Sequence, residues 1–123
     1  MNNDIKRISS QALAVVPDGA GGAGLSNAID YRGFAGGSFL TPATLDATTV
    51  IGYQGSNDGV NFATLYDKSN ALVATTVTLN ATRAYPLPDE LFGFAWFKIF
   101  TCTSGGVAVN QTGAKTFVLN LKG

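Results

Sequence analysis

The sequence contains no histidine and only one cysteine. Without histidine, the chain lacks the commonest general base, the commonest zinc ligand and the imidazole on which many nucleophilic dyads and triads depend. A single cysteine excludes a disulfide within the chain. Cys102 lies in the apolar segment 100–103, and we expect its thiol to be buried, because free cysteine behaves as a small hydrophobic residue.

Charge is also scarce. Charged residues make up 13% of the chain, and eight Lys and Arg balance eight Asp and Glu, so the formal net charge is +0. Non-specific binding to nucleic acid or to an anionic membrane needs clustered basic side chains, so neither partner is expected. Hydrophobic residues make up 46%. That fraction fits either a well-filled core or burial against partner subunits, and the sequence leaves both open.

No apolar run approaches the roughly 20 residues that span a bilayer. Lys6-Arg7 is followed by a short, mildly apolar run, residues 12–16, which makes a weak signal peptide, and we expect a mature, cytoplasmically made chain. No pair of carboxylates stands in a context typical of general acid–base catalysis. We therefore expect no enzymatic activity, no cofactor and no metal site.

A glycine-rich segment follows the N-terminal residues. Gly19, Gly21 and Gly24 match the spacing G-x-G-x-x-G of dinucleotide-binding loops. That function also requires a strand before the loop and an amphipathic helix after it. Residues 25–31 have no helical spacing of apolar residues, so we interpret the segment as a flexible loop.

The strongest local signal is a β-hairpin at residues 51–67. Two segments of alternating apolar residues flank the turn Ser56-Asn57-Asp58-Gly59. Asp-Gly between alternating hydrophobic residues favours a tight turn, because glycine accepts positive φ and the aspartate side chain can bond its own backbone. The hairpin predicts an antiparallel β protein.

From residue 29 onward, apolar residues repeat with a period of two in short segments separated by turn signals. We predict strands at residues 72–79 and 115–122, an edge segment at 84–88 because of its prolines, and one helical turn at 88–92. The spacing is typical of a sandwich or barrel with about seven or eight strands. Residues 1–28 are expected to form an N-terminal arm and glycine-rich loop, and residues 29–123 the β domain.

Residues 94–102, Phe-Ala-Trp-Phe-Lys-Ile-Phe-Thr-Cys, form an aromatic strand that is apolar on both faces. With a period of two, Phe97 and Ile99 fill one face. The opposite face carries Phe94, Trp96, Phe100 and Cys102. Such a strand is either central to a covered core or buried in a subunit contact.

Two features of this strand favour the subunit contact. Aromatic residues are enriched in the cores of interfaces. Lys98 shares the more aromatic face, and a lysine can extend to the rim of a contact but not out of a sealed core. We therefore predict that Phe94, Trp96 and Phe100 make subunit contacts.

Several short motifs resemble those of small bacteriophage and prophage virion proteins, over roughly residues 30–123. They are the Pro42-Ala43 turn with the strand after it, the Ser56-x-Asp58-Gly59 hairpin, the strand piece Phe97-Lys98-Ile99, the step Val109-Asn110-Gln111 and the last strand, residues 115–122.

The resemblance implies a jelly-roll-like antiparallel β-sandwich that acts as a capsid decoration, or cement, protein. Its expected partners are the major capsid protein and further copies of itself, as a trimer at a local three-fold axis. The expected location is the surface of the phage head, after synthesis in the host cytoplasm. A tail or baseplate accessory subunit is the near alternative.

Two further hypotheses concern particular residues. Ile5, Ile8, Leu13 and Val15 of the arm would reach a neighbouring subunit and become ordered on binding. The competing class of function is a carbohydrate-binding β-sandwich module, with Trp96, Tyr31 and Tyr53 as the platform for a glycan.

Overall fold

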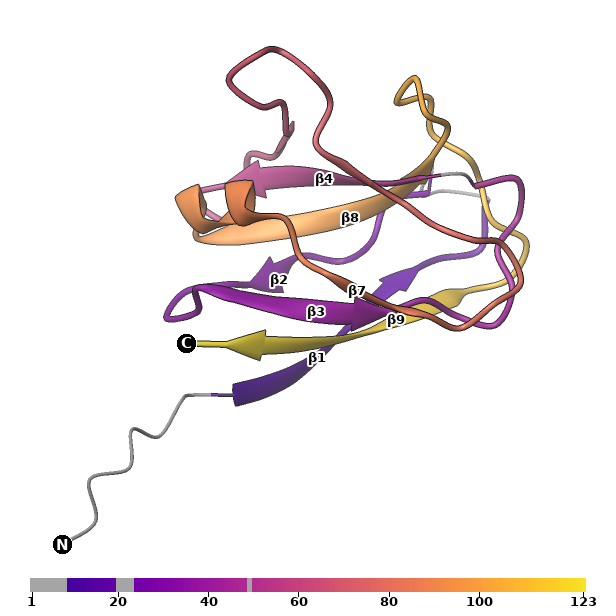
Figure 1. Cartoon of the computed structure of the whole chain (residues 1–123), viewed down its shortest axis with the longest axis horizontal. Helices are drawn as coiled ribbons and strands as arrows, with labels where there is room; N and C mark the ends of the chain where they lie inside the picture. Colours follow the sequence, from indigo (N-terminus) through magenta and orange to yellow (C-terminus); the bar gives the residue numbers. More distant parts are fainter. Residues whose placement is uncertain (1–8, 20–23, 49) are drawn as a thin grey trace, which may run out of the picture.

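The computed structural model describes residues 9–19, 24–48 and 50–123 (Figure 1). These residues contain nine strands and one short 3-10 helix, Asp89–Gly93. The strands form two antiparallel sheets. The first sheet has the order β1-β9-β3-β7, with strands Ser9–Val16, Lys115–Lys122, Gly36–Leu40 and Ala84–Pro86. The second has the order β2-β8-β4-β5, with strands Ile29–Asp30, Trp96–Cys102, Val50–Ser56 and Ala63–Thr64, and β6, Ala74–Thr76, also pairs with β4.

Strand pairing is nested around the hairpin that β4 begins. β4 pairs with β5 and β6, β3 with β7, β2 with β8, and β1 with β9. The chain is therefore a long double ribbon wrapped into two sheets, which is the arrangement of a jelly roll. This confirms the predicted all-β antiparallel sandwich. The strand number is higher than expected because two-residue strands such as β2 and β5 are too short to produce a period.

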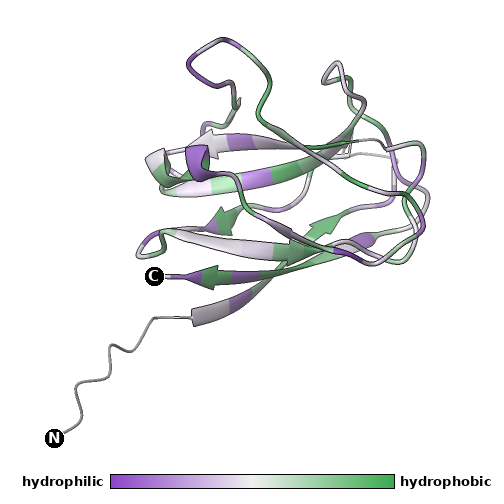
Figure 2. Cartoon of the chain, viewed as in Figure 1, coloured by the Kyte–Doolittle hydropathy of each residue, from purple (hydrophilic) through white to green (hydrophobic). Residues whose placement is uncertain are grey.

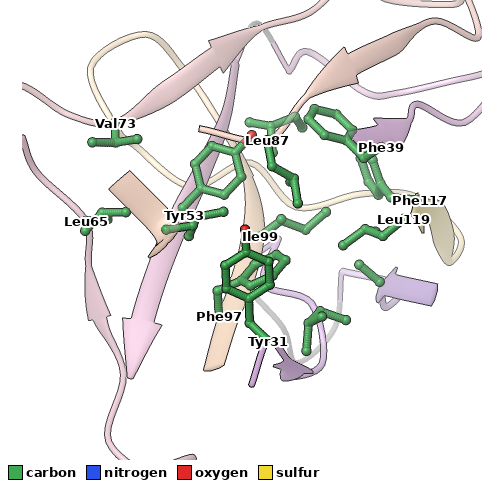
Figure 3. Close-up of a cluster of buried hydrophobic side chains, with 14 of the residues drawn as sticks. Tyr31, Phe39, Tyr53, Leu65, Val73, Leu87, Phe97, Ile99, Phe117 and Leu119 are labelled. Carbon is green, nitrogen blue, oxygen red and sulfur yellow. The ribbon is translucent and has the colours of Figure 1, made fainter. Parts of the chain in front are cut away.

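The core lies between the two sheets and is rich in aromatic rings (Figure 3). Tyr31 meets Phe97 edge to face, with ring centroids 5.3 Å apart, and Phe39 stacks on Tyr85 at 5.6 Å. Each large side chain that is fully buried contributes about 1.5–3 kcal/mol relative to exposure. Hydrophobic (green) and hydrophilic (purple) residues both occur along the strands in Figure 2. In β9, buried residues alternate with less buried ones, as expected for a strand with one buried face.

Glycines of β4 accommodate aromatic rings from β8 and from the segment before it. Gly52 lies opposite Phe100, and a Cβ at Gly52 would come within 2.5 Å of the Phe100 ring. A Cβ at Gly55 would come within 2.7 Å of the Phe94 ring. On opposite faces of the second sheet, Phe100 and Phe94 therefore occupy the space that a side chain at Gly52 or Gly55 would need. This fit also fixes the register of β4 against β8.

Several predicted elements are confirmed, and β9 has the predicted boundaries. β9 spans residues 115–122 with Phe117, Leu119 and Leu121 buried. β7 is an edge strand, and the single helical turn follows Pro88. The strand predicted at 72–79 is reduced to the three residues of β6, although Val73 and Val77 on either side of it are buried.

The N-terminal arm was predicted to include residues 9–16, and this is wrong. These residues form β1, which pairs with β9 along its whole length, and Ala14 and Val16 are 0% exposed. The alternation of small and apolar residues in β1 is too weak to identify a strand. Only its pairing partner, about a hundred residues away, reveals one. The predicted arm residues Ile5 and Ile8 lie outside the described residues.

Phe94 was predicted on the same face as Trp96 and Phe100, and this is also wrong. β8 begins at Trp96, and Phe94 follows directly on the 3-10 helix, so the period of two does not extend to it. Its ring packs over Gly55 against the main core, while Phe100 lies over Gly52 on the opposite face of the sheet.

The contact between Gly52 and Phe100 gives the first prediction. Gly52→Ala places a methyl group in the space of the Phe100 ring and should lower the free energy of unfolding by about 1–3 kcal/mol, measured by urea denaturation. Gly36→Ala, in β3, is the matched control, because a Cβ there meets nothing within 4 Å. Phe100→Leu in the Gly52→Ala background should recover part of the loss. Equal stability of the two glycine variants would contradict the proposed close packing.

Candidate functional site

The outer face of the first sheet is the surface that points away from the core, and it is almost free of charge. Register and burial place the following residues on it: Ser9, Gln11, Leu13 and Val15 of β1, Thr116, Val118, Asn120 and Lys122 of β9, Gly36, Ser38 and Leu40 of β3, and Ala84 and Pro86 of β7. Among these described positions, Lys122 alone carries a charge. Soluble surfaces ordinarily mix both signs of charge at about a quarter of their positions or more.

A row of apolar side chains crosses this face from one edge to the other. Leu13 lies opposite Val118, Val118 opposite Leu40, and Leu40 opposite Ala84. Leu13 is 52% exposed and Leu40 is 37% exposed. A contiguous apolar stripe on a sheet face indicates a binding surface more strongly than isolated exposed apolar residues do.

The free edge of β1 is partly closed by a side chain. The Asn27 side-chain oxygen accepts a hydrogen bond from the Val15 backbone N–H at 2.7 Å, and its nitrogen donates to the Leu13 carbonyl at 3.2 Å. The amide therefore takes the place of a neighbouring strand at these two residues. Blocking a free edge in this way opposes edge-to-edge pairing with another chain, so the outer face is a better candidate for contact than the edge is.

The outer face of the second sheet carries Trp96, which is half-buried by its own chain. The Arg32 guanidinium lies 4.7 Å from the centre of the Trp96 ring, and a Cβ at Gly59 would meet the same ring at 3.1 Å. Arg32 also forms an ion pair with Asp30 at 2.8 Å. The hydrogen bonds from Arg32 lower the pKa of the Asp30 carboxyl to about 2.

Further along β8 from Trp96, the side chains on this outer face pack against other residues of the chain. The Lys98 ammonium lies 4.5 Å from the centre of the Phe62 ring. Further along β8, Phe100 and Cys102 pack with Val50 and Leu25 in a second apolar cluster. The Cys102 thiol is buried, as predicted, and burial raises its pKa.

The hairpin turn is fixed by a dense set of hydrogen bonds to Asp58. Its carboxylate accepts bonds from the Val60 and Asn61 backbone N–H groups, both at 2.8 Å, and from the Asn61 side chain and the Ser56 hydroxyl. These bonds hold the pKa of Asp58 far below its usual range. The Ser-x-Asp-Gly motif therefore serves the turn itself.

Gln111 ties two distant loops together from a buried position. Its side chain, 1% exposed, accepts from the Asp46 backbone N–H at 2.8 Å and donates to the Asp46 carbonyl at 3.1 Å and the Thr48 hydroxyl at 2.8 Å. The Asp46 carboxylate in turn accepts from the Thr112 backbone N–H, which lowers its pKa. The sequence indicated Val109-Asn110-Gln111 only as a motif, and nothing in it revealed this clamp.

The structure separates the contact residues that the sequence grouped. Leu13 and Val15 lie on the outer face of the first sheet, and Trp96 is half-buried on that of the second. Phe100 is 6% exposed and offers little surface, and Phe94 is half-buried with its ring packed against the core. Their role as subunit contacts stays a prediction.

The glycan platform of Trp96, Tyr31 and Tyr53 does not form. Tyr31 is 3% exposed and Tyr53 is 0% exposed, both inside the core. The Tyr53 hydroxyl shares a 2.7 Å hydrogen bond with Thr75, and burial raises the Tyr53 pKa. Tyr53 lies at an inward position of β4 and Tyr31 directly follows β2, and both rings fill the core. The period of two does not show whether an isolated tyrosine faces the core or the solvent.

An open groove of about 620 Å³ separates β6 from the segment that follows β7. Asp67, Asp89 and Glu90 border it. Within residues 9–19, 24–48 and 50–123, however, no group of three or more acidic or cysteine side chains is arranged to hold a metal ion. The groove therefore offers open space beside acidic side chains without a ligand set.

Protonation of Asp58 gives a prediction about acid stability. Because its folded pKa lies below the ordinary value of about 3.9, the unfolded chain binds more protons in acid, so stability is present above pH 4 and falls as the pH drops below it. Asp58→Asn keeps an acceptor oxygen but removes the charge, and its unfolding midpoint should fall less steeply from pH 5 to 2. Thermal unfolding across this pH range measures the slope, and parallel profiles for the two proteins would contradict the role of Asp58.

Removal of the Gln111 clamp should be costly. Gln111→Met preserves the length of the side chain but leaves the Asp46 backbone N–H without its partner, while the Thr48 hydroxyl keeps its bond to the Asp46 carbonyl. We expect a loss of about 1–3 kcal/mol in the free energy of unfolding, measured in urea. Gln11→Met, at an exposed position of β1, is the matched control and should change stability by less than about 0.5 kcal/mol.

Comparisons with known proteins add no identification. A search of protein-family models, of curated proteins and of solved structures finds no match to this chain. In the part of the chain that the structure describes, no helix has the length and apolar character needed to cross a bilayer. Function is therefore argued from the two sheet faces and from the resemblance of the motifs.

Proposed function

We propose that this chain is a structural protein of a bacteriophage particle, a decoration protein that binds the assembled head lattice and stabilises it. Its action is binding and involves no chemical reaction. A position on the tail or baseplate is the alternative within the same class. Both follow from the motifs that resemble small virion proteins.

The observation that carries the proposal is the structural role of the motif residues. Ser56 and Asp58 fix the hairpin at the centre of the nested pairing. Gln111 clamps the loops that lead into β4 and β9. β9 itself is central in the first sheet. The residues that carry the resemblance are thus the ones that set the jelly roll, which supports a resemblance in fold as well as in sequence.

The fold alone does not choose the function, since jelly rolls occur in viral capsid proteins and in lectins. The surface favours the virion class. A glycan platform needs several exposed rings on one face, whereas Tyr31 and Tyr53 are buried, which leaves Trp96 alone of the three predicted rings. The carbohydrate-binding alternative has no such face among the residues that were predicted to form it.

A decoration protein stabilises a shell by mass action. Binding to the assembled lattice but not to free subunits adds RT ln(1 + [L]/Kd) per site. Many copies on one shell multiply weak contacts through effective concentration. We place the contact with the capsid on the outer face of the second sheet, where the half-buried Trp96 and the ion pair of Arg32 and Asp30 combine aromatic and polar groups.

The test uses particles of the phage whose genome encodes this chain. Heads that lack the protein should bind the purified chain on co-sedimentation, and addition of the chain should raise the temperature at which the heads release DNA. Trp96→Leu should weaken binding at least about tenfold, since tryptophan is a frequent energetic centre of interfaces. Phe92→Leu, at a ring that is 68% exposed on the 3-10 helix, is the matched control.

Three other outcomes are informative. Recovery of the chain with purified tails instead of heads supports the alternative position on the particle. Absence from all particles, together with no binding to heads, contradicts the proposed function. Equal effects of Trp96→Leu and Phe92→Leu contradict the assigned contact face while leaving the decoration function in place.

A further inference from the structure

We propose that the outer face of the first sheet binds a second copy of this chain, face to face, across the row Leu13, Val118, Leu40 and Ala84. The resulting dimer is symmetric and weak, and it forms in a concentration-dependent way. This self-association does not depend on the proposed function, and its test needs no phage particle.

The chemistry of the face selects its occupant. Its outward positions are apolar or neutral polar except for Lys122. A charged partner would lose hydration there without gaining an opposite charge, so a complementary partner must itself be uncharged. The same face on another copy meets this requirement.

Strand register shows that two such faces are compatible. A two-fold axis along the row Leu13–Val118–Leu40–Ala84 brings each apolar residue opposite its own counterpart, as in an isologous contact. Lys122 lies four residues beyond Val118 on β9. With a rise of about 3.4 Å per residue, the two Lys122 residues of the dimer are roughly 27 Å apart, well beyond the Debye length of about 8 Å at physiological salt.

The size of the face sets the expected strength. β1 and β9 have eight residues each, β3 has five and β7 has three. At about 3.4 Å per residue and about 4.8 Å between strands, they offer roughly 400 Å² per copy. Two copies bring about 800 Å² together, below the 1,200–2,000 Å² of stable complexes, so we expect a dissociation constant in the micromolar to millimolar range.

The geometry also limits the number of copies. Each copy uses this face in a single contact, so no such face is left for a third copy and the association stops at a dimer. The predicted stoichiometry is therefore a dimer, which differs from the trimer expected from the resemblance.

Sedimentation velocity of the purified chain, from about 10 µM to 1 mM, tests this inference. The wild type should shift from monomer to dimer with concentration. Leu13→Lys should weaken the dimer at least about tenfold, since each dimer loses two apolar contacts and gains two desolvated charges. The matched control is Val60→Lys, at a residue that is 78% exposed on the hairpin turn, and it should associate like the wild type.

A second measurement locates the contact without substitution. Backbone and methyl NMR shifts that change with concentration should map to β1, β9, β3 and β7 and should leave residues 56–61 unchanged. A wild-type chain that stays monomeric to 1 mM overturns the inference. So does a Leu13→Lys variant that is folded by NMR and dimerises like the wild type, and in that case the association uses another surface. Loss of capsid binding with dimerisation intact would instead count against the proposed function alone.

Discussion

The fit of aromatic rings over glycines between β4 and β8 is the constraint on which the rest of the structure depends. Phe100 lies over Gly52 on one face of the second sheet, and Phe94 lies over Gly55 on the other. A ring fits above a glycine only in one register, because a shift by one residue would place a side chain where the ring now lies. The central pair of the second sheet is fixed in this way, and the nested pairs β3·β7 and β1·β9 follow around it.

This constraint also explains where apolar surface of the molecule stays exposed to solvent. The sequence predicts subunit contacts for the aromatic strand because both of its faces are apolar. In the folded chain, Phe100 is buried in the cluster around Cys102 and the half-buried Phe94 packs over Gly55 against the core. Trp96 is the half-buried ring that lies on the outer face of the second sheet. Unpartnered apolar surface lies instead on the first sheet, where Leu13 and Leu40 face outward.

Polar side chains in this protein serve mainly to hold the backbone. Asp58 organises the hairpin turn, Gln111 joins two loops, and Asn27 closes part of the edge of β1. Throughout residues 9–19, 24–48 and 50–123, every buried side-chain nitrogen and oxygen has a hydrogen-bond partner. A scaffold with its loops fixed in this manner loses little conformational entropy on association, which suits a protein that acts by binding through preformed surfaces.

The sequence by itself determined the features that depend on near neighbours. The period of two identified β9 with its inward residues, the prolines placed β7 at an edge, and Ser-x-Asp-Gly identified the turn, because each rests on backbone geometry within a few residues. Tertiary structure decided the rest. β1 became a strand only through pairing with β9, and Phe94 left the face of Trp96 because a helical turn interrupts the alternation. Pairing across a hundred residues and the direction of a side chain after a turn are non-local, and a local pattern carries no information about either.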